Sequence, residues 1–179
     1  MHPATDTKDK YDYLVGSNFN EQSMLTVLNF PAIDARTKAE GKRTLIFDSI
    51  RKKYVALTPE EWVRQHLIHY LITEKGFPAT LISVETPLKY ARVDKRSDVL
   101  AYDRTGQPLM LAECKAPEVA ITQKVFEQIA VYNLTIQAPC LMVTNGLQHY
   151  CLSAATDSSP SSFLNEVPIY EDLLKMKKN

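Results

Sequence analysis

The feature that most constrains the fold is a β-hairpin pattern followed by an amphipathic helix and a buried strand. Two apolar runs, 97–103 and 109–115, flank a five-residue connection that contains Gly106. Residues 121–136 carry apolar side chains at helical spacing. Residues 140–144 are continuously apolar, which is typical of a strand buried on both faces. Because a helix between two strands of one sheet is a crossover connection, we expect a mixed sheet.

The clearest helix precedes this hairpin, over residues 59–75. Thr58 is a good N-cap, and Glu61 stands three residues later, as in a capping box. Pro59 occupies the first helical position, where its missing N–H costs nothing. Gly76 suits the position that follows a helix end.

The other elements complete an α/β pattern. Residues 80–86 alternate as in a strand, and 148–153 form a return strand after the Asn145-Gly146 turn. A short strand is expected at 44–47, and a short helix at 168–176. The order of helix, strands, helix and strands predicts an α/β fold, with a mixed β-sheet flanked by helices.

Composition and length agree with one domain. The chain has 179 residues, of which 45% are hydrophobic and 23% are charged, as in ordinary globular domains. We expect a flexible leader or extension at 1–23, the α/β domain at 24–156, and a C-terminal tail at 157–179 that includes the short helix. Because no apolar run approaches membrane-spanning length and the N-terminus has no secretory pattern, no membrane partner and a cytoplasmic location are expected.

The charge balance excludes charge-driven binding of the whole molecule to nucleic acid, since 21 Lys and Arg match 21 Asp and Glu. Residues 36–53 are locally basic, with seven Lys and Arg against two acids. This stretch is either a solvated hairpin or a flank that contacts phosphates through Arg51, Lys52 and Lys53.

Three charged side chains are expected to meet at the open end of the hairpin. Glu113 and Lys115 are two residues apart on one strand, so they share a face. With the turn centred near Gly106, Asp98 lies near-opposite Glu113. A divalent cation relieves repulsion between two carboxylates, and Mg²⁺ prefers such hard oxygen ligands. These are the parts of metal-assisted phosphodiester hydrolysis, although a strand-end Asp beside a solvent-exposed ion pair is the plainer interpretation.

The order of these residues resembles a known family. Asp98 followed by Glu113-Cys114-Lys115 resembles the D…(D/E)xK signature of the PD-(D/E)XK nuclease superfamily. Residues 44–153, with SDVLAYDRTGQPLMLAECKAP and LMVTNGLQHYC, resemble the N-terminal nuclease domain of type I restriction enzyme R subunits. The resemblance implies a restriction-endonuclease-like fold and a Mg²⁺-dependent DNA endonuclease, with Mn²⁺ as a substitute.

The resemblance also implies roles for particular residues. Asp98, Glu113 and the Cys114 carbonyl would bind the metal, and a helical Glu would support it, with Glu61 as the candidate and Glu60 as the alternative. Lys115 would be the catalytic lysine. Gln128 and Tyr132 match a QxxxY motif and would contact DNA near the metal or pack the helix.

Two features depart from the family pattern. Ser97 replaces the Pro that often precedes the Asp. R subunits continue into an ATP-driven translocase, whereas this chain has no GxxxxGK[ST] motif, so a separate motor or specificity subunit is an expected partner beside DNA.

Other functions fit parts of the pattern. One is a nuclease-like module that binds DNA or protein without cleavage, and another is an unrelated α/β enzyme that uses a carboxylate pair. A Cys114 nucleophile is a further alternative, but Cys114 is expected to pack in the core. Because Asp98, Glu113 and Lys115 are all present, the nuclease interpretation is favoured.

Overall fold

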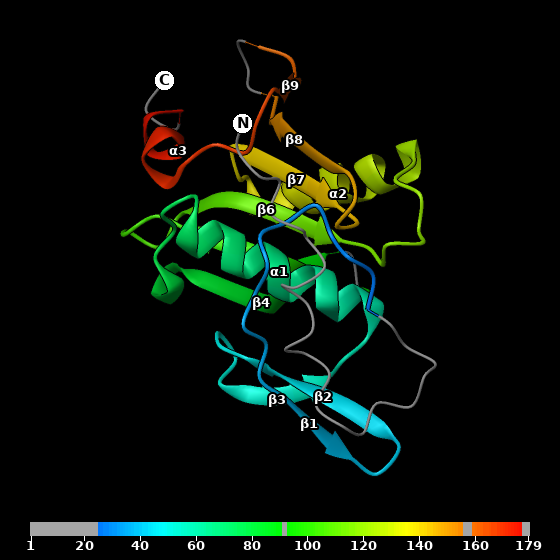
Figure 1. The fold of residues 1–179 in the computed structure, drawn as a ribbon. Helices are drawn as coiled ribbons and strands as arrows, with labels where there is room; N and C mark the ends of the chain where they lie inside the picture. Colours follow the sequence, from blue (N-terminus) through cyan, green and yellow to red (C-terminus); the bar gives the residue numbers. More distant parts are fainter. Residues whose placement is uncertain (1–24, 91–92, 156–158, 177–179) are drawn as a thin grey trace, which may run out of the picture.

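A six-stranded sheet forms the centre of the molecule (Figure 1). The computed structural model describes residues 25–90, 93–155 and 159–176, and of residues 88–90 and 93–95 it describes the backbone alone. The leader expected at 1–23 lies outside the described residues. The strands follow one another in chain order across the sheet: β4 (Ile82–Tyr90), β5 (Val93–Tyr102), β6 (Pro108–Cys114), β7 (Cys140–Thr144), β8 (His149–Ser153) and β9 (Ser162–Leu164).

The sheet is mixed, as the sequence predicts. Strands β6 and β7 are parallel, and every other neighbouring pair is antiparallel. Helix α2 (Gln123–Ile136) connects β6 to β7, because a parallel pair needs a crossover.

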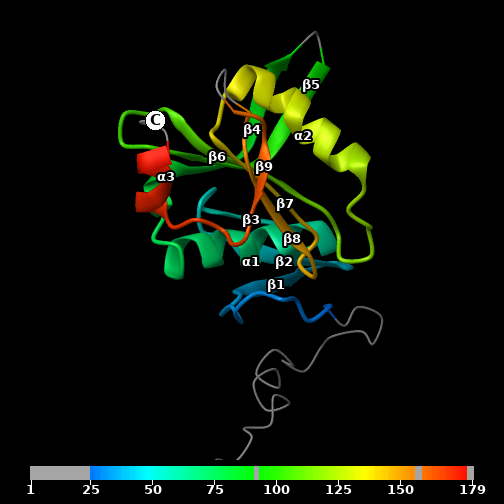
Figure 2. The same ribbon diagram turned by 90° about the horizontal axis from the view of Figure 1, so that it is seen from above.

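Helices cover both faces of this sheet (Figures 1 and 2). Helix α1 (Pro59–Thr73) buries Leu67 in a core with Met110, and α2 buries Ile129 in a second core with Leu111. Met110 and Leu111 are neighbours on β6, whose side chains alternate between the two faces. Both faces are therefore apolar, which explains the continuous apolar runs in the central strands.

Helix α1 begins as expected and ends two residues early. The Thr58 hydroxyl accepts a hydrogen bond from the Glu61 backbone N–H at 3.0 Å, and Gly76 adopts a φ of 71° just past the helix. The Glu61 carboxylate does not complete the capping box, because it binds Arg51 and Arg64 instead.

A separate three-stranded sheet lies beside the N-terminal end of α1, at the bottom of Figure 1. It consists of β1 (Thr37–Glu40), β2 (Arg43–Asp48) and β3 (Lys53–Ala56), where the sequence predicts only one short strand. One face packs Ile46 and Val55 against the main core. We call this element the small sheet.

The C-terminal segment is part of the fold rather than a detached tail. A short 3₁₀ helix, η3 (Ala79–Leu81), precedes the main sheet, and helix α3 (Tyr170–Met176) follows it. Helix α3 buries Leu173 and sets the Tyr170 ring edge to face with Phe77, with 5.5 Å between the ring centres. Strand β9 extends the sheet edge by pairing with β8. Among the described residues, no helix is long and apolar enough to cross a membrane.

Candidate active site

The hairpin brings the two predicted carboxylates together. Val99 pairs with Ala112, so one further step along the same register places Asp98 opposite Glu113. Asp98 Oδ2 accepts a hydrogen bond from the Cys114 backbone N–H at 2.7 Å, which fixes the carboxylate at the end of β6. Asp98 is half-buried and Glu113 is buried, so the pair lies at the rim of the core.

Glu113 is held by two donors. Its Oε1 accepts from Lys115 Nζ at 2.6 Å and from Gln128 Nε2 at 2.7 Å. Burial and the negative charge of Asp98 raise the pKa of Glu113 to about 7. Gln128, which the motif predicts to lie near the metal, therefore contacts the carboxylate itself and orients it.

Lys115 lies at the same rim with its ammonium partly exposed. Burial alone would lower the pKa of Lys115, but the hydrogen bond from Lys115 to Glu113 and the charges of Glu113 and Asp98 raise it. Lys115 is therefore a fixed positive charge next to the carboxylate pair.

Glu60 is the helical Glu whose charge acts on Glu113. Burial and the charge of Asp98 raise the pKa of Glu60, and Glu60 in turn contributes to the raised pKa of Glu113. One nitrogen of Arg64, Nη2, lies 2.7 Å from Asp98 Oδ1 and 3.2 Å from Glu60 Oε1, so it joins these two carboxylates.

Glu61, the residue first expected to support a metal, has both oxygens bound to other side chains. Oε1 accepts from Arg51 and Gln65, and Oε2 accepts from Arg64. Its place in α1, three residues before Arg64, directs it into this pairing. Both oxygens of Glu61 are therefore engaged within the protein.

Arg51, predicted as a phosphate contact, forms ion pairs within the protein. Its side chain is buried and bonds Asp48 and Glu61, each at 2.6 Å. Asp48 is fully buried and its second oxygen caps the backbone N–H groups of Ile50 and Arg51. Only Lys52 and Lys53 of the predicted basic triplet are exposed, so the phosphate-contact prediction remains for these two.

Tyr132 packs in the interior, which agrees with the helix-packing alternative. It is buried in the α2 core with Leu100 and Val143. Cys114 is buried on the opposite face of the sheet, in the α1 core, as expected. Burial raises the pKa of the Cys114 thiol well above its ordinary value, which disfavours a thiolate nucleophile.

The sequence patterns did not predict two residues of the site. Arg64 is buried in α1, and although burial would lower its pKa, the charges of Asp98 and Glu61 raise it. The sequence signal was the position of Arg64, three residues after Glu61 and four after Glu60, because such spacing allows ion pairs on one face of a helix. Glu85 lies opposite Asp98, in a gap of the β4–β5 ladder, with a φ of 52° and a 2.7 Å bond to Arg51. No local sequence signal marks such a backbone position for a non-glycine residue.

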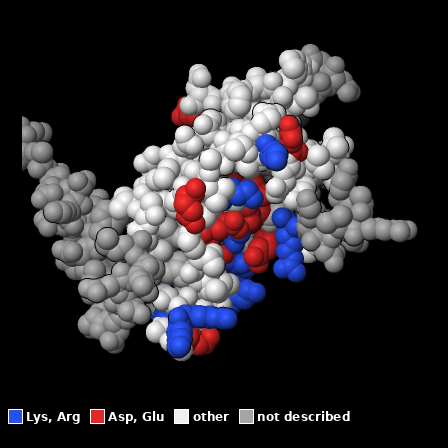
Figure 3. All heavy atoms as spheres, turned by 90° about the vertical axis from the view of Figure 1, so that its right-hand side faces the viewer, with Lys and Arg blue, Asp and Glu red and all other residues white. Residues whose placement is uncertain are grey.

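The surface view agrees with this description. In Figure 3, Asp and Glu side chains gather at the centre of the face that includes the start of α1 and the end of β6, with Lys and Arg among them. The region is thus an acidic centre with its own cations.

Comparison with known proteins identifies the domain. Residues 59–168 match the family described as type I restriction enzyme R protein N terminus. This match covers more than half of the chain.

The chain belongs to this family.

A solved structure shares the fold of this R-protein N-terminal domain. It is the fragment structure of an HsdR subunit of a type I restriction enzyme from Vibrio vulnificus YJ016, with a TM-score of 0.52 and 21% identity. The match covers 68% of this chain and 25% of that chain, so this chain spans about a quarter of the solved protein.

A curated relative carries a different name. An octanoyltransferase of Burkholderia thailandensis is 27% identical in an alignment of 172 residues that covers 87% of this chain and 67% of that protein. Acyl transfer through a thiol needs an accessible thiolate, and all three cysteines here are buried. The R-protein N-terminal domain therefore gives no support for thiol-based transfer.

The donor set of the site suits a magnesium ion. Among the described residues, no group of three or more His, Cys, Asp or Glu side chains is arranged to hold a metal. Mg²⁺ commonly binds through only one or two carboxylates, with waters and phosphate oxygens as its other ligands. Asp98 and Glu113 provide two, and burial, together with the charge of Asp98, raises the pKa of Glu113 to about 7.

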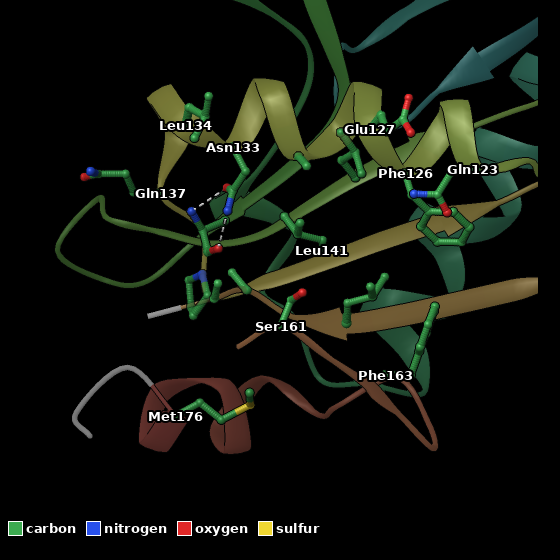
Figure 4. Close-up of a pocket in the computed structure, with 17 residues that line it drawn as sticks. Gln123, Phe126, Glu127, Asn133, Leu134, Gln137, Leu141, Ser161, Phe163 and Met176 are labelled. Atoms are coloured by element: carbon green, nitrogen blue, oxygen red, sulfur yellow. Dashed lines mark hydrogen bonds between the residues drawn. The ribbon is translucent and has the colours of Figure 1, made fainter. Parts of the chain in front are cut away.

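A separate groove lies elsewhere in the molecule. About 820 Å³ in volume, it is bounded by α2 and the edge strands, with Phe126, Leu134 and Phe163 on its walls (Figure 4). Among the described residues that line it, Glu127 is the one charged side chain.

Proposed function

We propose that this R-protein N-terminal domain is a Mg²⁺-dependent DNA endonuclease, with Mn²⁺ able to replace Mg²⁺. The observation that carries the proposal is the meeting of Asp98, Glu113 and Lys115 at one end of the β5–β6 hairpin. The family and the solved relative support a nuclease-like domain, and this arrangement supports the finer proposal of hydrolysis.

The metal would be held by the carboxylates of Asp98 and Glu113 and by the Cys114 carbonyl, with Glu60 as the auxiliary carboxylate. When bound, the ion would polarise a phosphoryl oxygen and lower the pKa of a bound water. Gln128 holds one oxygen of Glu113, so the other is free to face a ligand. The side chains thus orient the oxygens before any ligand arrives, which lowers the cost of reorganisation.

Lys115 would act on the phosphate. In hydrolysis, the oxygen of a water forms a bond to phosphorus while one bridging P–O bond breaks. The attacking water passes a proton to solvent, and the leaving oxygen takes a proton from solvent. Negative charge grows on the phosphoryl oxygens as this happens, and an ammonium at the rim stabilises it. Lys115 meets this requirement because its ammonium is fixed by Glu113 at 2.6 Å and is partly exposed.

We further propose DNA and the other subunits of a type I restriction system as partners. The chain has no GxxxxGK[ST] motif, so a motor segment or subunit must supply any ATP-driven translocation. The competing function is a nuclease-like module that binds DNA or protein without cutting it.

Incubation of the purified protein with supercoiled and linear DNA separates these functions. We expect nicking or linearisation with Mg²⁺ or Mn²⁺ and none in EDTA, because the ion is needed to offset charge on the phosphate. Agarose electrophoresis of a time course measures the rate. DNA that stays intact under every metal condition, while it is bound by the protein, would favour the binding module.

A further inference from the structure

The outer face of the small sheet is basic and contains aromatic rings. Lys38 pairs with Leu45 and Phe47 pairs with Tyr54, and residues directly opposite one another share a face. The alternate residues Ile46 and Val55 face the core. Lys38, Phe47 and Tyr54 therefore point away from the domain.

Exposed cations dominate this part of the surface. Within residues 36–53 the one exposed acid is Glu40, whereas Arg51 and Asp48 are buried together. Among the described residues the only ion pair of this group is Lys38–Glu40, at 3.9 Å. The exposed cations, free to meet a polyanion, are Arg36, Lys38, Lys42, Arg43, Lys52 and Lys53.

Two of the cations are ordered by aromatic rings. The Arg36 guanidinium lies 4.0 Å from the centre of the Phe47 ring, and Lys38 Nζ lies 4.6 Å from the centre of the Tyr54 ring. The two rings meet edge to face at 5.3 Å, and Tyr54 is 39% exposed. Cations beside an exposed ring such as Tyr54 suit single-stranded nucleic acid, whose phosphates need charge and whose unpaired bases offer flat faces for stacking.

The small sheet is tied to the candidate active site. Arg51, which follows β2, bonds Glu61 of α1 at 2.6 Å, and α1 also carries Glu60 and Arg64. In Figure 3 the Lys and Arg side chains of the small sheet gather below the acidic centre, on the same face. A strand bound to this face would thus continue toward Asp98 and Glu113.

We infer that the outer face of the small sheet binds single-stranded nucleic acid through Arg36, Lys38, Arg43 and Tyr54. The delivery of that strand to Asp98 and Glu113 rests on the proposed nuclease function, whereas the binding itself does not.

Fluorescence anisotropy with a labelled oligothymidine and a duplex of equal length tests the inference in EDTA, where no cleavage interferes. Lys38→Gln with Arg43→Gln should weaken oligothymidine binding about tenfold and reduce the log–log salt slope by about 1.4, at about 0.7 per phosphate contact on single strands. Tyr54→Ala should weaken binding about fivefold or more through lost stacking. Lys175→Gln on α3, where the side chain is 75% exposed, is the matched control and should change neither value.

Equal affinity for duplex and single strand, or variants that bind like wild type, would overturn the inference. Because these side chains are exposed, melting curves of the variants should match wild type and exclude misfolding. If the small-sheet variants bind oligothymidine more weakly than wild type, but the protein cleaves no DNA with Mg²⁺, the binding surface is supported and the nuclease function is contradicted. Metal-dependent cleavage without oligothymidine binding would do the reverse.

Discussion

Replacement of Lys115 by Ala should lower the single-turnover cleavage rate by about 10²–10³-fold, by analogy with the loss of one oxyanion donor. The ammonium contacts Glu113 at 2.6 Å and stands at the rim, where charge develops on the phosphate. DNA affinity in EDTA should change little, because one of many cations is removed. Quench-flow or gel time courses at saturating Mg²⁺ measure the effect.

Lys115→Arg is the matched variant for this prediction. Its planar guanidinium keeps the charge but not the compact geometry, so we expect poor rescue of the rate. Cleavage by Lys115→Ala at the wild-type rate would show that another group performs this role or that a contaminant cuts the DNA.

Replacement of Arg64 by Met should destabilise the fold by about 3–5 kcal/mol, the usual cost of removing one partner from buried ion pairs. The Arg64 side chain is only 6% exposed and bonds Glu61 and Asp98, with Glu60 at 3.2 Å. Without it, these carboxylates would share one partly desolvated region with little compensation. The urea midpoint and slope measure the free energy of unfolding.

Arg43→Met provides the control, because Arg43 is exposed on β2 and should cost no more than about 0.5 kcal/mol. A loss below about 1 kcal/mol in Arg64→Met would mean that water, rather than Arg64, compensates these carboxylates.

The fold was predictable where local and long-range patterns coincide. The capped start of α1 at Thr58 and the crossover helix α2 follow from residue spacing alone. The small sheet was less accessible, because its short strands carry mostly polar residues and only Ile46 and Val55 record the buried face. Strand β9 has three residues, too few for a period to be recognised.

The residues of the candidate site also divide into those that local patterns predict and those that tertiary contacts decide. The proximity of Asp98, Glu113 and Lys115 follows from the register of the hairpin, because residues equally far from its turn lie opposite one another. The choice between Glu60 and Glu61 depends on which carboxylate Arg51 and Arg64 bind. Because Arg51 lies between β2 and β3 of the small sheet, this pairing depends on tertiary structure. The pairing of Arg51 with Glu61 was likewise decided by tertiary packing, since nothing in the sequence near Arg51 indicates this partner. The burial of Tyr132, by contrast, agrees with the apolar spacing of α2.

Thermal melting with Mn²⁺ tests most directly whether the carboxylate pair holds a divalent cation. At about 100 times its Kd, a ligand of the native state adds about 2.7 kcal/mol, which for a domain of this size raises Tm by about 5–10 °C. Asp98→Asn should lose most of this shift relative to its own metal-free Tm, whereas Asp172→Asn on the exposed surface of α3 should keep it. An equal shift in wild type and Asp98→Asn would contradict the metal site.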